Sequence, residues 1–159
     1  MAQARSDWAV LKRLSGKVET CHTLHYLQMA TEKLAKALLT SPCGADPAPP
    51  THVIFVRMLQ VLKARPEIRV RLGYGDAAQA FRKYIDSLLD YAGRIERLAP
   101  DQAGFDHPNP EYPWLDKPKR QVLAPCEYSF DQFYPRDKKT ITKMAKIDML
   151  VGELLKLSV

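Results

Sequence analysis

Cysteine and glycine are scarce in this sequence, and long apolar stretches are absent from it. The three cysteines, Cys21, Cys43 and Cys126, are odd in number and widely scattered. Such a set predicts reduced thiols in a cytoplasmic protein rather than a disulfide framework. No apolar run reaches 18 residues, so no membrane-spanning segment is expected. Met1–Val10 contains no apolar signal core, which also favours the cytoplasm.

The common sequence signatures of nucleotide binding and hydrolysis are missing as well. There is no P-loop, no GxGxxG and no GxSxG. Cys21, His22 and His25 have a spacing that metal ligands can use, but no second pair completes a four-ligand zinc site. Asp86 and Asp90 are one helical turn apart, and we interpret them as solvated carboxylates. No metal and no cofactor are therefore expected.

The charged residues are unevenly distributed along a chain of net charge +6. Residues 51–75 carry five cations against Glu67 alone, whereas residues 101–133 carry three basic and six acidic side chains. The cations of the first stretch are Arg57, Lys63, Arg65, Arg69 and Arg71. A basic body favours nucleic acid or an acidic partner. The alternative is an ordinary solvated helix face beside a polar loop.

Apolar periodicity indicates an all-α fold. From about Asp7 to Thr40 the apolar residues recur with helical spacing, and Gly16 could divide this stretch into two helices. One stripe of this pattern consists of Leu24, Leu27, Thr31, Leu34 and Leu38. Proline excludes a helix over Ser41–Pro50, and Thr51 could cap a second helix over about 52–65. Its buried side would consist of Ile54, Phe55, Met58, Leu59 and Leu62.

Two further helices are expected, over about 77–98 and about 135–157, with Pro66 and Gly73–Gly75 interrupting the chain before the first. The buried side of the helix over 77–98 would consist of Phe81, Tyr84, Ile85, Leu88, Leu89 and Ile95. The last helix would bury Ile141, Met144, Ile147, Val151, Leu154 and Leu155. We therefore predict an antiparallel up-down bundle of four to five helices in one domain over 1–159, because about 160 residues suffice for one core.

Residues 100–133 differ from the rest, because they combine many prolines with many aromatic residues. Proline excludes a long helix here, and the aromatic side chains argue against disorder. We expect an ordered excursion before the last helix, with Gln121–Leu123 and Glu127–Phe130 as a possible short hairpin. Long loops of this kind are often functional, but a lid that only covers apolar helix surface is the simpler interpretation.

His25–Leu39 is the most distinctive segment, and it resembles the HEPN superfamily of small helical bundles. In members of that family an aromatic residue and small residues precede a Glu-Lys-x-x-Lys-Ala-Leu-Leu pattern on the first long helix. The matching positions here are Tyr26, Ala30, Glu32, Lys33, Lys36, Ala37, Leu38 and Leu39. A histidine that opens the next helix is also typical, and His52 corresponds to it. The match covers about 15 residues plus this histidine.

The resemblance implies a helical bundle, often a homodimer, in toxin–antitoxin or phage-defence systems, frequently beside a nucleotidyltransferase. Many members are RNases with an Arg-x4-6-His motif, in which histidine moves a proton and arginine stabilises charge on the phosphate. This sequence lacks that motif, because none of its four histidines follows an arginine at that spacing and His52 precedes Arg57.

Three functions follow as hypotheses. The first is a non-catalytic HEPN-like module that binds RNA, a nucleotide or a protein partner. Its candidate ligand-binding residues are His25, Glu32, Lys33, Lys36, His52 and Arg57. The second is a metal-independent RNase with a departed active site, in which His52 and Arg57 act across a dimer. The third is a purely structural assembly protein that makes contacts through the aromatic residues of 105–133.

Some of the candidate residues also have a simpler interpretation. For Glu32 and Lys36 it is a surface ion pair, and for His25 it is an exposed or packed histidine.

Overall fold

Helices form most of the structure, which confirms the all-α prediction. The computed structural model describes residues 1–40, 54–100, 107–133 and 138–157. Its α-helices are α1 (Ala2–Leu14), α2 (Thr20–Leu39), α3 (Phe55–Leu62), α4 (Pro66–Arg71), α5 (Ala78–Asp86), α6 (Leu89–Glu96) and α8 (Lys138–Leu155). A small hairpin of β1 (Trp114–Asp116) and β2 (Gln121–Leu123) and a 3-10 turn, η1 (Pro125–Glu127), lie between α6 and α8. Within these residues, no helix is both long and apolar enough to cross a membrane.

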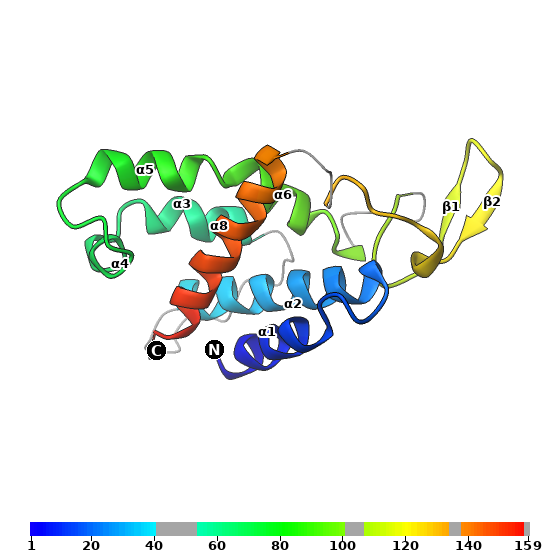
Figure 1. Ribbon diagram of the computed structural model, residues 1–159, viewed down its shortest axis with the longest axis horizontal. Helices are drawn as coiled ribbons and strands as arrows, with labels where there is room; N and C mark the ends of the chain where they lie inside the picture. The colour runs from blue at the N-terminus through cyan, green and yellow to red at the C-terminus, as the bar shows by residue number, and fades with distance from the viewer. Residues whose placement is uncertain (41–53, 101–106, 134–137, 158–159) are drawn as a thin grey trace.

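The helix α2 is the centre of the bundle. It packs against α1 along its length and also contacts α3, α6 and α8, with α8 crossing it obliquely (Figure 1). The predicted stripe on α2 faces this core: Leu24, Thr31 and Leu34 are buried, and Leu27 and Leu38 pack against the core half-buried. A helix with neighbours on several sides requires a broad apolar arc, which explains why the pattern was so clear in the sequence.

The long first pattern forms two helices. The break lies at Gly16, whose φ of 74° suits glycine because it has no Cβ to clash in the left-handed region. α1 begins at Ala2, five residues before the expected start.

The helix expected over about 52–65 is shorter than predicted, since α3 spans Phe55–Leu62. The five residues predicted for its buried side are all buried. The proposed loop over 41–50 and the proposed cap Thr51 lie outside the described residues.

The prediction of one helix over 77–98 was wrong, because the chain turns at Ser87–Leu88 between α5 and α6. The Ser87 hydroxyl donates to the Tyr84 carbonyl at 2.7 Å, and the amide of Leu88 bonds three residues back, to Ile85. A serine hydroxyl that bonds to a nearby carbonyl competes with the hydrogen bonds of the helix, and apolar periodicity does not reveal a turn of this kind.

Pro66 was expected only to interrupt the chain, but α4 begins at this residue, because proline is compatible with the first turn of a helix.

The excursion after α6 is ordered over 107–133, but its hairpin differs from the predicted one. Gln121–Leu123 pairs with Trp114–Asp116 instead of Glu127–Phe130, and Glu127 belongs to η1. Pro125 opens that 3-10 turn and leaves no second strand downstream. Trp114 and Phe130 are buried and pack edge-to-face with Tyr128, at ring-centroid distances of 5.3 Å and 4.9 Å from it. These three rings hold the hairpin to the helices.

The last helix, α8, buries most of its predicted core side. Ile147, Val151, Leu154 and Leu155 are buried and Met144 is half-buried. Ile141 was wrongly assigned to this side: it is 54% exposed, because it lies at the edge of the apolar arc, beyond the reach of the neighbouring helices. Residues 134–137, where this helix was expected to start, lie outside the described part of the chain.

Candidate functional site

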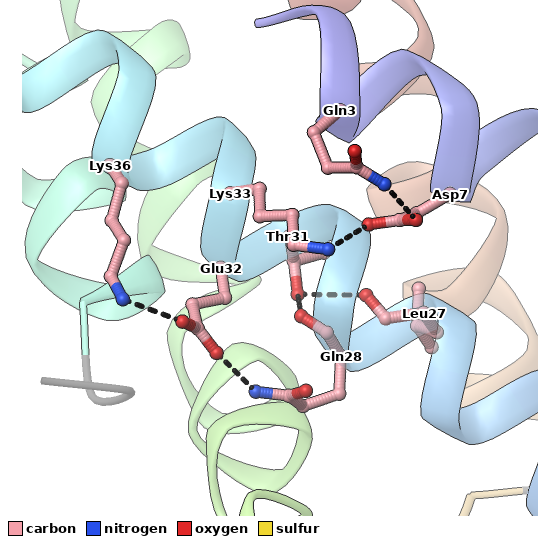
Figure 2. Close-up of polar contacts among 8 residues, drawn as sticks. All are labelled: Gln3, Asp7, Leu27, Gln28, Thr31, Glu32, Lys33 and Lys36. Carbon is pink, nitrogen blue, oxygen red and sulfur yellow. Dashed lines mark hydrogen bonds and ion pairs between the residues drawn. The ribbon is translucent and has the colours of Figure 1, made fainter.

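Glu32 is buried in the fold, and its carboxylate is held by two neighbours on α2 (Figure 2). Gln28 donates from Nε2 to Oε2 at 2.8 Å, and Lys36 donates from Nζ to Oε1 at 2.7 Å. The Glu32 side chain is only 7% exposed and that of Lys36 is 26% exposed. The surface interpretation of the Glu32–Lys36 pair was therefore wrong, because the other helices that pack around α2 cover its glutamate.

Lys33 points in another direction and connects α2 to α1. Its ammonium donates to Oδ2 of Asp7 at 2.7 Å, and Gln3 donates to Oδ1 of the same carboxylate at 3.0 Å (Figure 2). Asp7 is buried, with 6% exposure. A buried carboxylate with a cation and an amide as partners is a well-compensated structural group. The resemblance-bearing residues Glu32, Lys33 and Lys36 thus have contacts inside the molecule.

The other predicted ligand-binding residues do not join this cluster. His25 lies seven residues before Glu32, with Nδ1 at 3.9 Å from Oε2 of Glu111 and its ring edge-on to Tyr26. Arg57 is exposed on α3. His52 lies outside the described residues. Of the six candidates, the structure therefore brings Glu32 and Lys36 into contact and leaves His25 and Arg57 separate from them.

Metal ligands do not gather anywhere in the described ranges. No group of three or more histidine, cysteine, aspartate or glutamate side chains converges there as a metal site would require. Cys21 is buried, and desolvation raises the pKa of its thiol, which disfavours the thiolate that binds metals. Its neighbour in sequence, His22, is exposed.

The cations of the basic 51–75 stretch are largely occupied by contacts within the protein. Lys63 forms an ion pair with Asp86 of α5, and Arg65 lies 3.6 Å from Glu67. Arg71 donates to the Lys156 carbonyl at the end of α8, at 3.3 Å. Arg57 is exposed and the structure gives no such contact for it, and the buried Nε of Arg69 has no hydrogen-bond partner among the described residues. Only the Lys63–Asp86 pair adds an acid to the charge count over 51–75, because Glu67 is already part of that count and a carbonyl does not neutralise Arg71.

A larger concentration of positive charge lies where α6 and the first half of α8 meet the excursion. One groove there is lined by Ser87, Lys138, Lys139, Thr142, Lys143 and Lys146. A second groove is lined by Arg94, Arg97, Leu98, His107, Pro108, Gln132 and Phe133. None of these described lining residues is acidic. We refer to Arg94, Arg97, Lys138, Lys139, Lys143 and Lys146 as the α6–α8 cationic surface.

Asp90 joins the two grooves into one surface. Its Oδ2 accepts from Lys143, of the first groove, and from Arg94, of the second, each at 3.1 Å. The hydrogen bond from Lys143 is the main cause that holds the pKa of Asp90 below its ordinary value, and Arg94 adds to it. Arg94 and Lys143 share this carboxylate, and the described residues that line the two grooves include no acid, so positive charge exceeds negative charge on this surface. Clustered positive charge of this kind attracts anions in general.

Our sequence reasoning missed this surface, although a local charge count would have found half of it. Residues 138–146 contain four lysines and no acid. At 100° per residue, Lys139, Lys143 and Lys146 lie within one narrow arc of a helix. The contribution of Arg94 and Arg97 was not foreseeable in this way, since α6 is about 40 residues earlier in the chain.

Comparisons of the chain with protein-family models, with curated proteins and with solved structures found no significant match. The interpretation of the site therefore depends on its own geometry and charge.

Proposed function

We propose that the protein is a non-catalytic, HEPN-like module that binds RNA through the α6–α8 cationic surface. The observation that carries this proposal is the pair of adjoining grooves with six cations and no acidic lining residue, bridged by Asp90. Lysine and arginine contacts to phosphates release counterions from the nucleic acid, and this supplies most of the affinity of sequence-independent binding.

Two features support a binding role over catalysis. The sequence lacks the Arg-x4-6-His motif with which family RNases move a proton and stabilise phosphate charge. Of the residues that carry the resemblance, Lys33 is bonded to Asp7 of α1, and Glu32 and Lys36 are bonded to each other within α2. A role in a toxin–antitoxin or phage-defence system, a homodimer and a nucleotidyltransferase partner belong to the same proposal and rest on the resemblance alone.

The test is fluorescence anisotropy with a labelled RNA of about 20 nucleotides, titrated at about 50 mM and about 200 mM salt. We compare the wild-type protein with a Lys143→Gln/Lys146→Gln variant. The matched control is Arg13→Gln/Lys17→Gln, which removes the same charge from exposed positions at the end of α1. The first variant should bind at least about tenfold more weakly at the lower salt, because two phosphate contacts are lost. The control should lose much less affinity.

Three outcomes would contradict the proposal. Undetectable binding of the wild-type protein at low salt excludes RNA as the ligand. Equal losses in the two variants would mean that only the net charge matters and that the α6–α8 surface is not the site. Cleavage of the labelled RNA by the wild-type protein, resolved on a denaturing gel, would contradict a non-catalytic role and favour the RNase hypothesis.

A further inference from the structure

The β1–β2 hairpin exposes an apolar pair to solvent at the end of the molecule where it projects from the helices (Figure 1). Leu115 and Val122 are direct cross-strand partners, with 43% and 69% exposure. The neighbouring pair, Trp114 and Leu123, belongs to the opposite face and packs against the core. In the described residues, β1 and β2 pair only with each other, so each strand also has an outer edge.

The base of this hairpin is firmly anchored. Trp114 is 3% exposed and Phe130 is fully buried, with their ring centroids 6.3 Å apart. Phe130 adopts a φ of 49°, a left-handed conformation that an aromatic residue takes only when its surroundings impose it. An apolar pair on such a fixed support is preorganised, and a partner that binds it loses little conformational entropy from the hairpin.

The charge around the apolar pair is positive at the turn. Lys117, Lys119 and Arg120 are exposed there, beside Asp116. Asp116 Oδ1 accepts from the Lys119 amide and its Oδ2 lies 3.3 Å from the Lys119 ammonium, so these two charges offset each other and residues 116–120 keep a net charge of about +2. Glu111 and Glu127 lie outside the strands and the turn, and their contacts are with His25 and the Ala124 amide.

We propose that the outward face of the hairpin binds an extended, acidic and apolar segment of a partner protein. Alternating apolar side chains of that segment would cover Leu115 and Val122, and its carboxylates would lie against the basic turn. An aliphatic pair gains little from phosphates, so a polypeptide fits this face better than RNA does. A second copy of the chain would bring its own basic turn to the same surface. The α6–α8 cationic surface shares no residue with this hairpin, so the two proposals are independent.

The experiment uses the whole chain labelled with 15N and a synthetic peptide of about eight alternating glutamate and valine residues, added up to about 1 mM. Saturable chemical-shift changes should be confined to residues 114–123. Leu115→Thr/Val122→Thr, which keeps a strand-compatible residue at both positions, should weaken the affinity at least about tenfold. Val70→Thr, at a position 60% exposed on α4, is the matched control and should leave the affinity unchanged. Arg120 has a φ of 51°, in the left-handed region that asparagine tolerates, so Lys119→Gln/Arg120→Asn is a suitable second variant and should also weaken binding.

Several results would overturn the inference. The first is that no chemical shift changes at the highest peptide concentration. The second is that a lysine–valine peptide binds as tightly as the glutamate–valine peptide. The third is that the Leu115→Thr/Val122→Thr variant binds the peptide as tightly as the wild-type protein does. If the RNA used above shifts these hairpin resonances and the peptide does not, the occupant is a nucleic acid. If light scattering shows that the double threonine variant has a lower mass than the wild-type protein, the occupant is a second copy of the chain.

Discussion

In the part of the chain that the structure describes, three carboxylates are buried, those of Asp7, Glu32 and Glu96, and each accepts hydrogen bonds within the protein. Asp7 has Lys33 and Gln3, and Glu32 has Lys36 and Gln28. Glu96 accepts the amide of Val56 at 2.8 Å and so caps the first turn of α3. Removing one partner of such a contact costs more than the contact contributes, because the remaining group stays buried without compensation.

The Asp7–Lys33 contact should make a measurable contribution to stability. We expect Lys33→Met to lower the free energy of unfolding by about 1–3 kcal/mol, since it leaves Asp7 buried with Gln3 alone. Lys12→Met, which breaks the exposed pair with Asp148, should cost less than about 1 kcal/mol. Urea unfolding followed by circular dichroism measures both. Equal effects of the two substitutions would show that Asp7 is more hydrated than its burial implies.

Glu96 should make stability depend on pH in the direction opposite to an ordinary salt-bridged carboxylate. Burial raises the pKa of Glu96 above its ordinary value of 4.5, and the Val56 and Phe55 amides offset this only in part. The folded protein therefore keeps this proton at pH values where the unfolded chain has released it. The stabilising contribution is complete below pH 4.5 and is lost as the pH rises through the folded-state pKa.

Glu96→Gln tests this, because glutamine still offers an oxygen to the Val56 amide but does not titrate. The free energy of unfolding of the wild-type protein should fall relative to that of the variant as the pH rises from about 4 to about 7. Parallel stability curves over that range would show that Glu96 titrates normally. Groups that titrate elsewhere, such as Asp90, contribute equally to both curves and cancel in the difference.

At the level of elements, the end of α8 depends on arginines from distant helices. Arg5 of α1 donates from Nε to the Leu155 carbonyl at 2.7 Å and from Nη2 to the Leu157 carbonyl at 2.8 Å. Arg71, at the end of α4, donates to the Lys156 carbonyl. The last carbonyls of a helix have no partner within the helix and carry partial negative charge, so guanidinium groups stabilise them well.

Arg5→Ala should therefore loosen the last turn of α8 and cost about 1–2 kcal/mol of stability. Amide hydrogen exchange should show faster exchange in the last turn of α8, with little change in its first turns. Arg5→Lys should recover only part of the loss, since an ammonium cannot reproduce the two-pronged geometry. Arg13→Ala, at an exposed position of the same helix, is the control. An unchanged exchange pattern would mean that packing alone fixes this turn.

The helices themselves were largely predictable, whereas their ends and the hairpin were not. Apolar spacing identified α2, α3 and α8 because one face of each helix must be buried. The turn at Ser87–Leu88 depends on one hydroxyl and the Tyr84 carbonyl, which leaves no trace in the periodicity. The partner of Gln121–Leu123 was misassigned, because a three-residue strand with Pro125 close by contains too little pattern to specify its register.

For the molecule as a whole, the distribution of charge matters more than its sum. Three of the five cations counted over 51–75 have contacts within the protein, while six cations from α6 and α8 line two grooves that Asp90 bridges. Electrostatic attraction between this surface and a polyanion should be strongly screened by salt.

The salt dependence of RNA binding measures how many of these cations reach phosphates. For a single strand, each contact contributes about −0.7 to the slope of log K against log salt concentration, so the six cations allow a slope of about −4 at most. The Lys143→Gln/Lys146→Gln variant should reduce the magnitude of the slope by about 1 to 1.5. A slope near zero, or one that the variant does not change, would contradict phosphate binding at this surface.

The sequence by itself determined that the protein is helical and that it is organised around the helix that contains His25–Leu39, because a stripe of apolar residues at helical spacing allows few other arrangements. The tertiary structure decided which polar residues remain available to a partner. Glu32, Lys33 and Lys36 resemble a surface site in the sequence, yet packing of the neighbouring helices around α2 turns them into internal contacts. The α6–α8 cationic surface arises only when α8 residues meet α6 residues such as Asp90, which is 53 positions from Lys143, since charges far apart in the chain combine their fields only after folding.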